Sequence, residues 1–398
     1  THLTIDNDSL LLPTTISEGA FCGCWYLVKV SFAEGLEVIG DGSFEGCVGL
    51  QTVDMASTVR SIGKRCFSKC SSLEDISLPR WLQRIPENAF SECESLTTIA
   101  IPSAVYEIGK NCFHRCISLA NVSFANDDSS QLQMIGAGAF KCCLALRRVH
   151  LPFTVRSIGK TAFLSCVSLD EIRVPHGLEV IDDHTFFFCE SLQKVSLPLT
   201  VNKVGTGAFQ DCKSLVEVTN AEGLQIMGER AFKNCTKLQA IPTFVNGLVR
   251  IGDSALYDCH LIVKIDLQDG LREIPARCFA NCTKLMYVSI PQTLNTIGKG
   301  AFLGCKELLG VELPATNKVH IGNGAFQGCA SLVTISIASC SMSSSSLPKD
   351  TFWTCKRLQR SRCNLMEALC DRYADLPVHQ ACYGASHTTV ADLTAAIR

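Results

Sequence analysis

Residues 70–93 read Cys-Ser-Ser-Leu-Glu-Asp-Ile-Ser-Leu-Pro-Arg-Trp-Leu-Gln-Arg-Ile-Pro-Glu-Asn-Ala-Phe-Ser-Glu-Cys, and nearly the same arrangement returns along the chain. Its ending, Phe-x-x-Cys, occurs in 15 units when Leu256 is accepted in place of one Phe. Of the 14 intervals between units, ten are 23 residues long, two are 24, and two are lengthened to 27 and 26 by insertions. A fixed period of this length is typical of a solenoid of stacked units.

The other repeat positions keep the register of the Phe and the Cys. Leu stands three residues after the Cys in 14 of 15 units, and Val or Ile stands six residues after it in 14 of 15. The motif pairs are Phe21/Cys24, Phe44/Cys47, Phe67/Cys70, Phe90/Cys93, Phe113/Cys116, Phe140/Cys143, Phe163/Cys166, Phe186/Cys189, Phe209/Cys212, Phe232/Cys235, Leu256/Cys259, Phe279/Cys282, Phe302/Cys305, Phe326/Cys329 and Phe352/Cys355.

Each unit predicts one short strand and two turns. The alternation of Leu, Ile and Leu at 73, 76 and 78 indicates a strand with one buried face. The proline at 79 ends the pairing because it lacks an N–H, and Ile85-Pro86 (Ile-Gly in most units) indicates a second turn. Ala89-Phe90-x-x-Cys93 is interpreted as a short helical or 3₁₀ turn. No unit buries its own apolar face, so the units must stack on their near-copies.

This pattern, Leu-x-x-Ile-x-Leu-Pro followed by Ile-Gly-x-x-Ala-Phe-x-x-Cys, resembles the BspA-like (treponemal-type) class of leucine-rich repeat over residues 10–358. The resemblance implies a repeat solenoid, mostly β with short helical or 3₁₀ turns. It also implies a right-handed array of about 15 coils with a parallel sheet on the concave side. It further implies a non-enzymatic binding role, often at a cell surface, but no single ligand.

The 24 cysteines are best explained as a column of buried thiols. Fifteen occupy the repeat position, and Cys66, Cys112 and Cys278 stand before the repeat Phe, where Ala is the common residue. Exchange with Ala indicates a need for a small side chain, and free Cys behaves as a small hydrophobe. The predicted core ladder includes Phe44, Phe67, Phe90, Phe113, Phe163, Cys47, Cys70, Cys93, Cys116 and Cys166.

Disulfides between neighbouring coils remain an alternative, since coils about 4.8 Å apart place Cα atoms within reach of a bridge. A metal site is disfavoured because the clustered Cys-x₂-Cys pairs it needs are lacking. Reduced thiols favour an intracellular location, with a secreted or surface location as the alternative.

Composition excludes several classes of function. Lys plus Arg is 36 and Asp plus Glu is 38, which leaves a net charge of −2 and no field for nucleic acid. No run of about 18 apolar residues would span a bilayer. The nine histidines are scattered, and the sequence contains no G-x-S-x-G, P-loop, H-E-x-x-H or dinucleotide fingerprint. We therefore expect no enzyme, no cofactor and no metal.

The outward positions of the strand, five and seven residues after each repeat Cys, form the candidate binding surface. Ser and Thr dominate the second of these columns. Charge with a basic excess gathers in coils six to eight, at Arg148, His150, Glu171, Arg173 and Lys194. Lys264, Asp266 and Tyr287 are a weaker second candidate. A solvated sheet face with ordinary charges is the alternative interpretation.

The repeat decays after Leu358, which divides the chain into a solenoid at 1–358 and a second segment at 359–398. Residues 359–375 predict an amphipathic helix that caps the last coil. Residues 376–382, Leu-Pro-Val-His-Gln-Ala-Cys, are similar to the ankyrin signature. The spacing of Cys363, Cys370, His379, Cys382 and His387 matches no standard zinc finger. A removed leader before Thr1 and a continuation past Arg398 are compatible with the sequence.

We therefore predict a monomeric interaction scaffold that binds a protein partner on its concave sheet. The alternative function is a secreted or surface adhesin of the BspA-like type that binds host or matrix proteins. An enzyme regulated by the array would need a catalytic domain outside this sequence.

Overall fold

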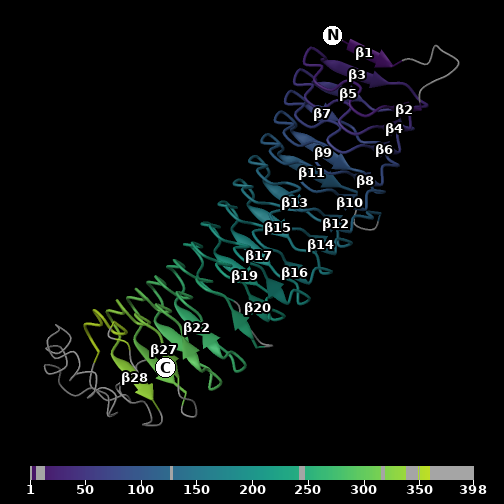
Figure 1. Ribbon diagram of the computed structural model, residues 1–398. Helices are drawn as coiled ribbons and strands as arrows, with labels where there is room; N and C mark the ends of the chain where they lie inside the picture. Colours follow the sequence, from purple (N-terminus) through teal and green to yellow (C-terminus); the bar gives the residue numbers. More distant parts are fainter. Residues whose placement is uncertain are drawn as a thin grey trace. The chain divides into compact units, whose positions relative to one another are not determined.

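The structure is a computed structural model that describes residues 2–5, 14–125, 129–241, 247–314, 319–337, 348 and 350–358. Two compact units make up the chain, Thr1–Cys259 and His260–Arg398. Each is a solenoid of parallel strands, as the repeat predicts, and each carries two kinds of sheet. We call the sheets formed six residues after each repeat Cys the main sheets, and those formed by the Ile before each Gly or Pro the second sheets. In the first unit the two kinds run side by side (Figure 1).

The main-sheet strands lie where the alternation of apolar residues predicts them. Their central Val or Ile is buried while both neighbours face outward, as in the exposed–buried–exposed pattern of β15. In the first unit they are β1 (His2–Ile5), β3 (Lys29–Phe32), β5 (Thr52–Asp54), β7 (Asp75–Ile76), β9 (Thr98–Ile101), β11 (Asn121–Phe124), β13 (Arg148–His150), β15 (Glu171–Arg173), β17 (Lys194–Ser196) and β19 (Glu217–Thr219). In the second unit they are β22 (Lys264–Asp266), β24 (Tyr287–Ser289), β26 (Gly310–Leu313) and β28 (Thr334–Ile337).

The second sheets correct our interpretation of Ile-Gly as a turn, since the Ile ends a two-residue strand in every such coil described. In the first unit these strands are β2 (Thr15–Ile16), β4 (Val38–Ile39), β6 (Ser61–Ile62), β8 (Arg84–Ile85), β10 (Glu107–Ile108), β12 (Met134–Ile135), β14 (Ser157–Ile158), β16 (Val180–Ile181), β18 (Lys203–Val204), β20 (Ile226–Met227) and β21 (Arg250–Ile251). In the second unit they are β23 (Glu273–Ile274), β25 (Thr296–Ile297) and β27 (His320–Ile321).

The expectation of a short helix at Ala-Phe-x-x-Cys is wrong for the described residues, which contain no helix. The segment is a run of turns in which the residues two before and two after the Phe are left-handed, such as Arg65 (φ 55°) and Lys69 (φ 60°). This conformation turns backbone N–H groups toward the next coil, so Phe67 N donates to Ala89 O at 2.9 Å. Bonds between coils replace the bonds that a helix would make within one coil.

The repeat phenylalanines form the centre of each unit. In the first unit the rings from Phe21 to Phe232 stack coil on coil, with centroids 5.1 to 5.6 Å apart and planes 4° to 13° from parallel. The rings from Phe44 to Phe232 are buried. Stacking at this distance is favourable for offset aromatic rings. The predicted phenylalanine ladder is confirmed.

The repeat cysteines form a second column beside the rings. No disulfide joins the cysteines of the described residues, and every repeat Cys from Cys47 to Cys355 is buried. Each thiol for which the bond is resolved donates to the carbonyl of the repeat Phe one coil earlier. Cys166 Sγ, for example, lies 3.2 Å from Phe140 O. The residue must therefore be small and carry a weak donor, and a thiol meets both needs.

The position before the Phe also follows its predicted chemistry. Cys66, Cys112 and Cys278 are buried there, as are the alanines of other coils. Where the residue is hydroxylated, its oxygen donates to a backbone carbonyl three residues earlier, as Thr185 Oγ1 does to Asp182 O at 2.8 Å. The site accepts any small side chain whose polar atom finds a local acceptor.

Candidate functional site

The predicted patch lies on three adjacent main-sheet strands of the first unit. Parallel register places Arg148 beside Glu171 and Glu171 beside Lys194, while His150 stands beside Arg173. All five side chains are exposed. We call these five residues the strand patch. The structure thus brings together every residue that the sequence placed in this cluster.

The first column of the strand patch is largely neutralised by its own neighbours. Arg148 Nε lies 3.5 Å from Asp170 Oδ1 and 4.0 Å from Glu171 Oε2. Lys194 Nζ lies 3.7 Å from Glu217 Oε2. Exposed ion pairs of this kind contribute little to stability. The basic excess that the sequence showed does not therefore lie in this column.

The second column keeps its positive charge. It runs through His150, Arg173, Ser196 and Thr219, so no acidic side chain follows Arg173 on the next two strands. Arg173 makes no ion pair with any residue that the structure describes. The unpaired guanidinium is the group on this face best suited to a planar carboxylate from outside.

The weaker candidate belongs to the second unit. Lys264 Nζ contacts Asp266 Oδ2 at 3.0 Å within β22, and Tyr287 stands beside Lys264 on β24. Because the lysine and the aspartate pair with each other, this cluster offers a half-buried tyrosine and little net charge.

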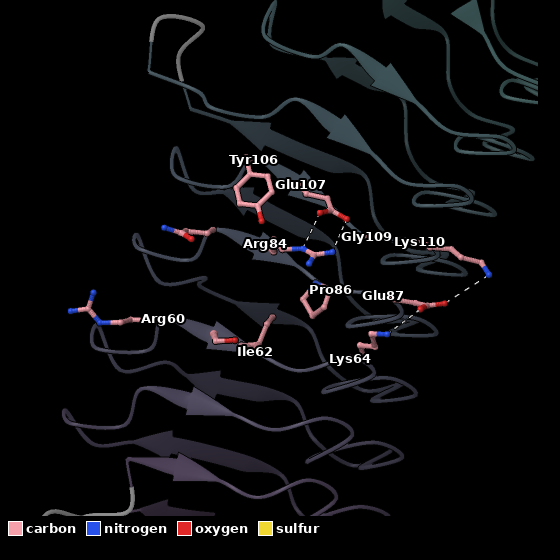
Figure 2. A pocket seen from close by; sticks show the side chains of 12 residues that line it. Arg60, Ile62, Lys64, Arg84, Pro86, Glu87, Tyr106, Glu107, Gly109 and Lys110 are labelled. Atoms are coloured by element: carbon pink, nitrogen blue, oxygen red, sulfur yellow. Dashed lines mark hydrogen bonds and ion pairs between the residues drawn. The ribbon is translucent and has the colours of Figure 1, made fainter.

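A hollow of about 450 Å³ lies on the second sheet around β6, β8 and β10, and sequence reasoning missed it because that sheet was not expected (Figure 2). Arg84 binds Glu107 through two contacts of 2.9 Å. Glu87 lies 3.8 Å from both Lys64 and Lys110. The remaining lining side chains include Arg60 and Tyr106. Four basic groups thus face two acidic ones, most of them already paired, and no nucleophile stands beside a base.

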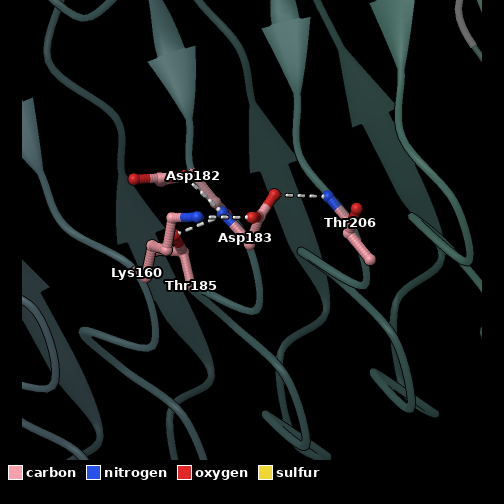
Figure 3. A network of polar contacts seen from close by, with 5 residues as sticks. All are labelled: Lys160, Asp182, Asp183, Thr185 and Thr206. Atoms are coloured by element: carbon pink, nitrogen blue, oxygen red, sulfur yellow. Dashed lines mark hydrogen bonds and ion pairs between the residues drawn. The ribbon is translucent and has the colours of Figure 1, made fainter.

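A polar network on the turn side of coils seven to nine has a structural explanation (Figure 3). Asp183 Oδ2 lies 2.8 Å from Lys160 Nζ, and Asp183 Oδ1 accepts a hydrogen bond of 2.9 Å from Thr206 N. Partial burial raises the pKa of Asp183, but these hydrogen bonds outweigh it and hold the pKa below its ordinary value. One carboxylate therefore ties three successive coils together.

The thiols are not poised for catalysis. Burial raises the pKa of Cys47 to about 11 and that of Cys355 to about 12, and it raises the pKa of fully buried thiols such as Cys93 further. A nucleophilic cysteine needs the opposite shift. In the part of the chain that the structure describes, no three Cys, His, Asp or Glu side chains converge on a metal position. Over the same residues, no helix is long and apolar enough to cross a membrane.

The ladders, turns and paired sheets define a leucine-rich repeat solenoid. The family model for the BspA type leucine rich repeat region matches residues 14–131, 128–239, 205–333 and 241–359. The chain belongs to this family, as the repeat motif predicted. The family match ends before the segment similar to ankyrin and gives it no support. That segment and the predicted cap lie outside the described residues.

Solved structures agree on the fold. A leucine-rich repeat protein from Bacteroides ovatus is 28% identical with a TM-score of 0.64, covering 78% of this chain and 81% of that one. A leucine rich cell surface protein from Faecalibacterium prausnitzii is 27% identical with a TM-score of 0.48, covering 72% of this chain and 87% of that one. A search of curated proteins found no match.

Proposed function

We propose that the chain is a non-enzymatic scaffold that binds a partner protein through the main-sheet face of its first unit, centred on the strand patch. One observation carries the proposal: three adjacent strands present charged, exposed side chains, and Arg173 among them has no ionic partner in the described residues. Solenoids bind along such faces, and arginine is enriched where binding energy concentrates.

Two observations support the non-enzymatic part. Catalysis requires unlike groups that converge on one point, whereas each coil repeats the chemistry of its neighbours. The thiols, the most numerous reactive groups, are buried with raised pKa values. Leucine-rich repeat solenoids are typically interaction scaffolds, and the adhesin alternative stays a prediction.

The double variant Arg148→Ala with Arg173→Ala tests the binding face. A partner is first isolated with the intact chain and identified by mass spectrometry, and its Kd is then measured by calorimetry. We expect the double variant to weaken binding at least tenfold, since a fully covered arginine is worth about 2 kcal/mol or more.

The matched control is Arg60→Ala with Arg84→Ala, which removes the same charge from the second-sheet hollow. It should leave the Kd unchanged. Unaltered affinity in the strand-patch variant, or an equal loss in the control, would remove the strand patch as the binding face.

A further inference from the structure

An apolar rim borders the strand patch in the same three coils. Three residues beyond the second column, each coil turns toward the second sheet through an exposed residue, namely Phe153, His176 or Leu199. Phe153 is 47% exposed and Leu199 is 68% exposed. We call these three residues the rim.

The rim is unusual among the coils. At the same repeat position the other described coils carry polar residues, which are Glu34, Ser57, Arg80, Ser103, Glu222, Asp269 and Gln292. Large apolar side chains therefore stand at this position only where the second column is basic and unpaired. Two independent departures from the repeat, one of charge and one of polarity, coincide in coils six to eight.

The rim and the second column form one continuous surface. Three residues of extended chain span at most about 10 Å, so Phe153 lies within that distance of His150. Neighbouring coils are about 4.8 Å apart. The guanidinium of Arg173 therefore stands in the coil between those that carry Phe153 and Leu199, within reach of one short peptide segment.

The backbone of the rim is held in place before any partner arrives. Arg156 donates to Phe153 O at 2.8 Å. Thr200 Oγ1 lies 2.7 Å from His176 O and so links two successive rim turns. The prolines before the rim residues, at 152, 175 and 198, are buried. A surface fixed in this way loses little conformational entropy on binding.

We propose that the rim and the second column together bind an extended acidic–apolar segment of the partner protein. A carboxylate of that segment forms a two-pronged ion pair with Arg173, and its apolar side chains cover Phe153 and Leu199. The inference rests on the proposed function and adds the chemistry of the partner. Charge complementarity selects this occupant, because the second column offers positive charge and no acid in the described coils beside Arg173.

Peptide display on the intact chain tests the chemistry. A random library of 12-residue peptides is selected against the protein, and the enriched peptide is synthesised in two forms, one with its carboxylates and one with amides in their place. Binding is measured by fluorescence anisotropy. We expect enrichment of carboxylates flanked by apolar residues, and at least a tenfold weaker Kd for the amide form.

Variants assign the contacts. Arg173→Gln should weaken the carboxylate peptide at least tenfold and remove the difference between the two peptides. Phe153→Ser with Leu199→Ser should weaken both peptides. The matched controls are Arg84→Gln, a paired arginine on the second sheet, and Trp81→Ser, an exposed aromatic residue near the rim position of another coil. All variants replace exposed side chains, so their thermal unfolding should match that of the parent.

Enriched peptides without acidic residues, or peptides indifferent to Arg173→Gln, would overturn the inference. Equal losses in the controls would do the same. So would a dimer in solution that Phe153→Ser with Leu199→Ser dissociates, since it would assign the rim to a second copy. The proposed function would survive each result if Arg148→Ala with Arg173→Ala still weakened the partner protein, so the two failures are distinguishable.

Discussion

Replacing Phe163 by alanine is expected to lower the free energy of unfolding by about 3–5 kcal/mol, the usual cost of removing a buried phenylalanine. Phe163 is fully buried, and its ring lies 5.3 Å from that of Phe140 and 5.5 Å from that of Phe186. Each stacked pair adds about 0.5–1.5 kcal/mol beyond the area buried. Because every coil depends on its two neighbours, the cavity weakens two interfaces at once.

Urea unfolding followed by far-ultraviolet circular dichroism measures this loss. The matched control is Phe153→Ala, in which the same side chain is removed from an exposed rim position. It should cost less than about 1 kcal/mol, as surface substitutions do. Similar losses at the two positions would mean that the phenylalanine ladder does not hold the coils together.

Alkaline pH is expected to unfold the protein steeply. Burial raises the pKa of the column thiols above the ordinary thiol value, which is about 8.5. Above that pH the unfolded chain loses thiol protons that the folded chain retains, so the folded state binds more protons and stability falls as pH rises. Each such thiol costs about 1.4 kcal/mol per pH unit. Ten of them reach about 14 kcal/mol, comparable with the total stability of a domain.

The unfolding free energy measured between pH 7 and pH 10 checks this dependence. Cys112→Ala supplies the matched variant, because alanine is the ordinary residue at that position in other coils. Its stability should fall less steeply than that of the parent, by about 1.4 kcal/mol per pH unit above the ordinary thiol pKa. Parallel profiles for the two proteins would contradict the view that these thiols are buried and protonated.

The repeat predicted the fold because ladder positions are read directly from the spacing. A Leu, an Ile and a Phe recurring every 23 residues are buried together only when coils stack in register, and Leu73, Ile76 and Phe90 are buried. The second sheet was missed because a strand of two residues, such as Ser61–Ile62, is too short to show alternation. The left-handed turns were read as helical because glycine marks them in only some coils, whereas Arg65 and Lys69 occupy them in another.

The strand patch was predicted as a cluster but not in its charge balance. Residues one coil apart, such as Arg148 and Glu171, are known to be neighbours from the period alone. Whether they pair depends on side-chain geometry and on a third residue, here Asp170. The rim was missed for another reason: Phe153 and Leu199 lie in turns, where exposed apolar residues interrupt no pattern.

Thiol counting with Ellman's reagent tests the central claim that near-identical coils bury a continuous column of reduced cysteines. In the folded protein, the 17 cysteines that the structure describes as buried should stay unreactive. After denaturation without reductant, the count should rise to all 24. Full reactivity before denaturation, or a count near zero after it, would contradict the account.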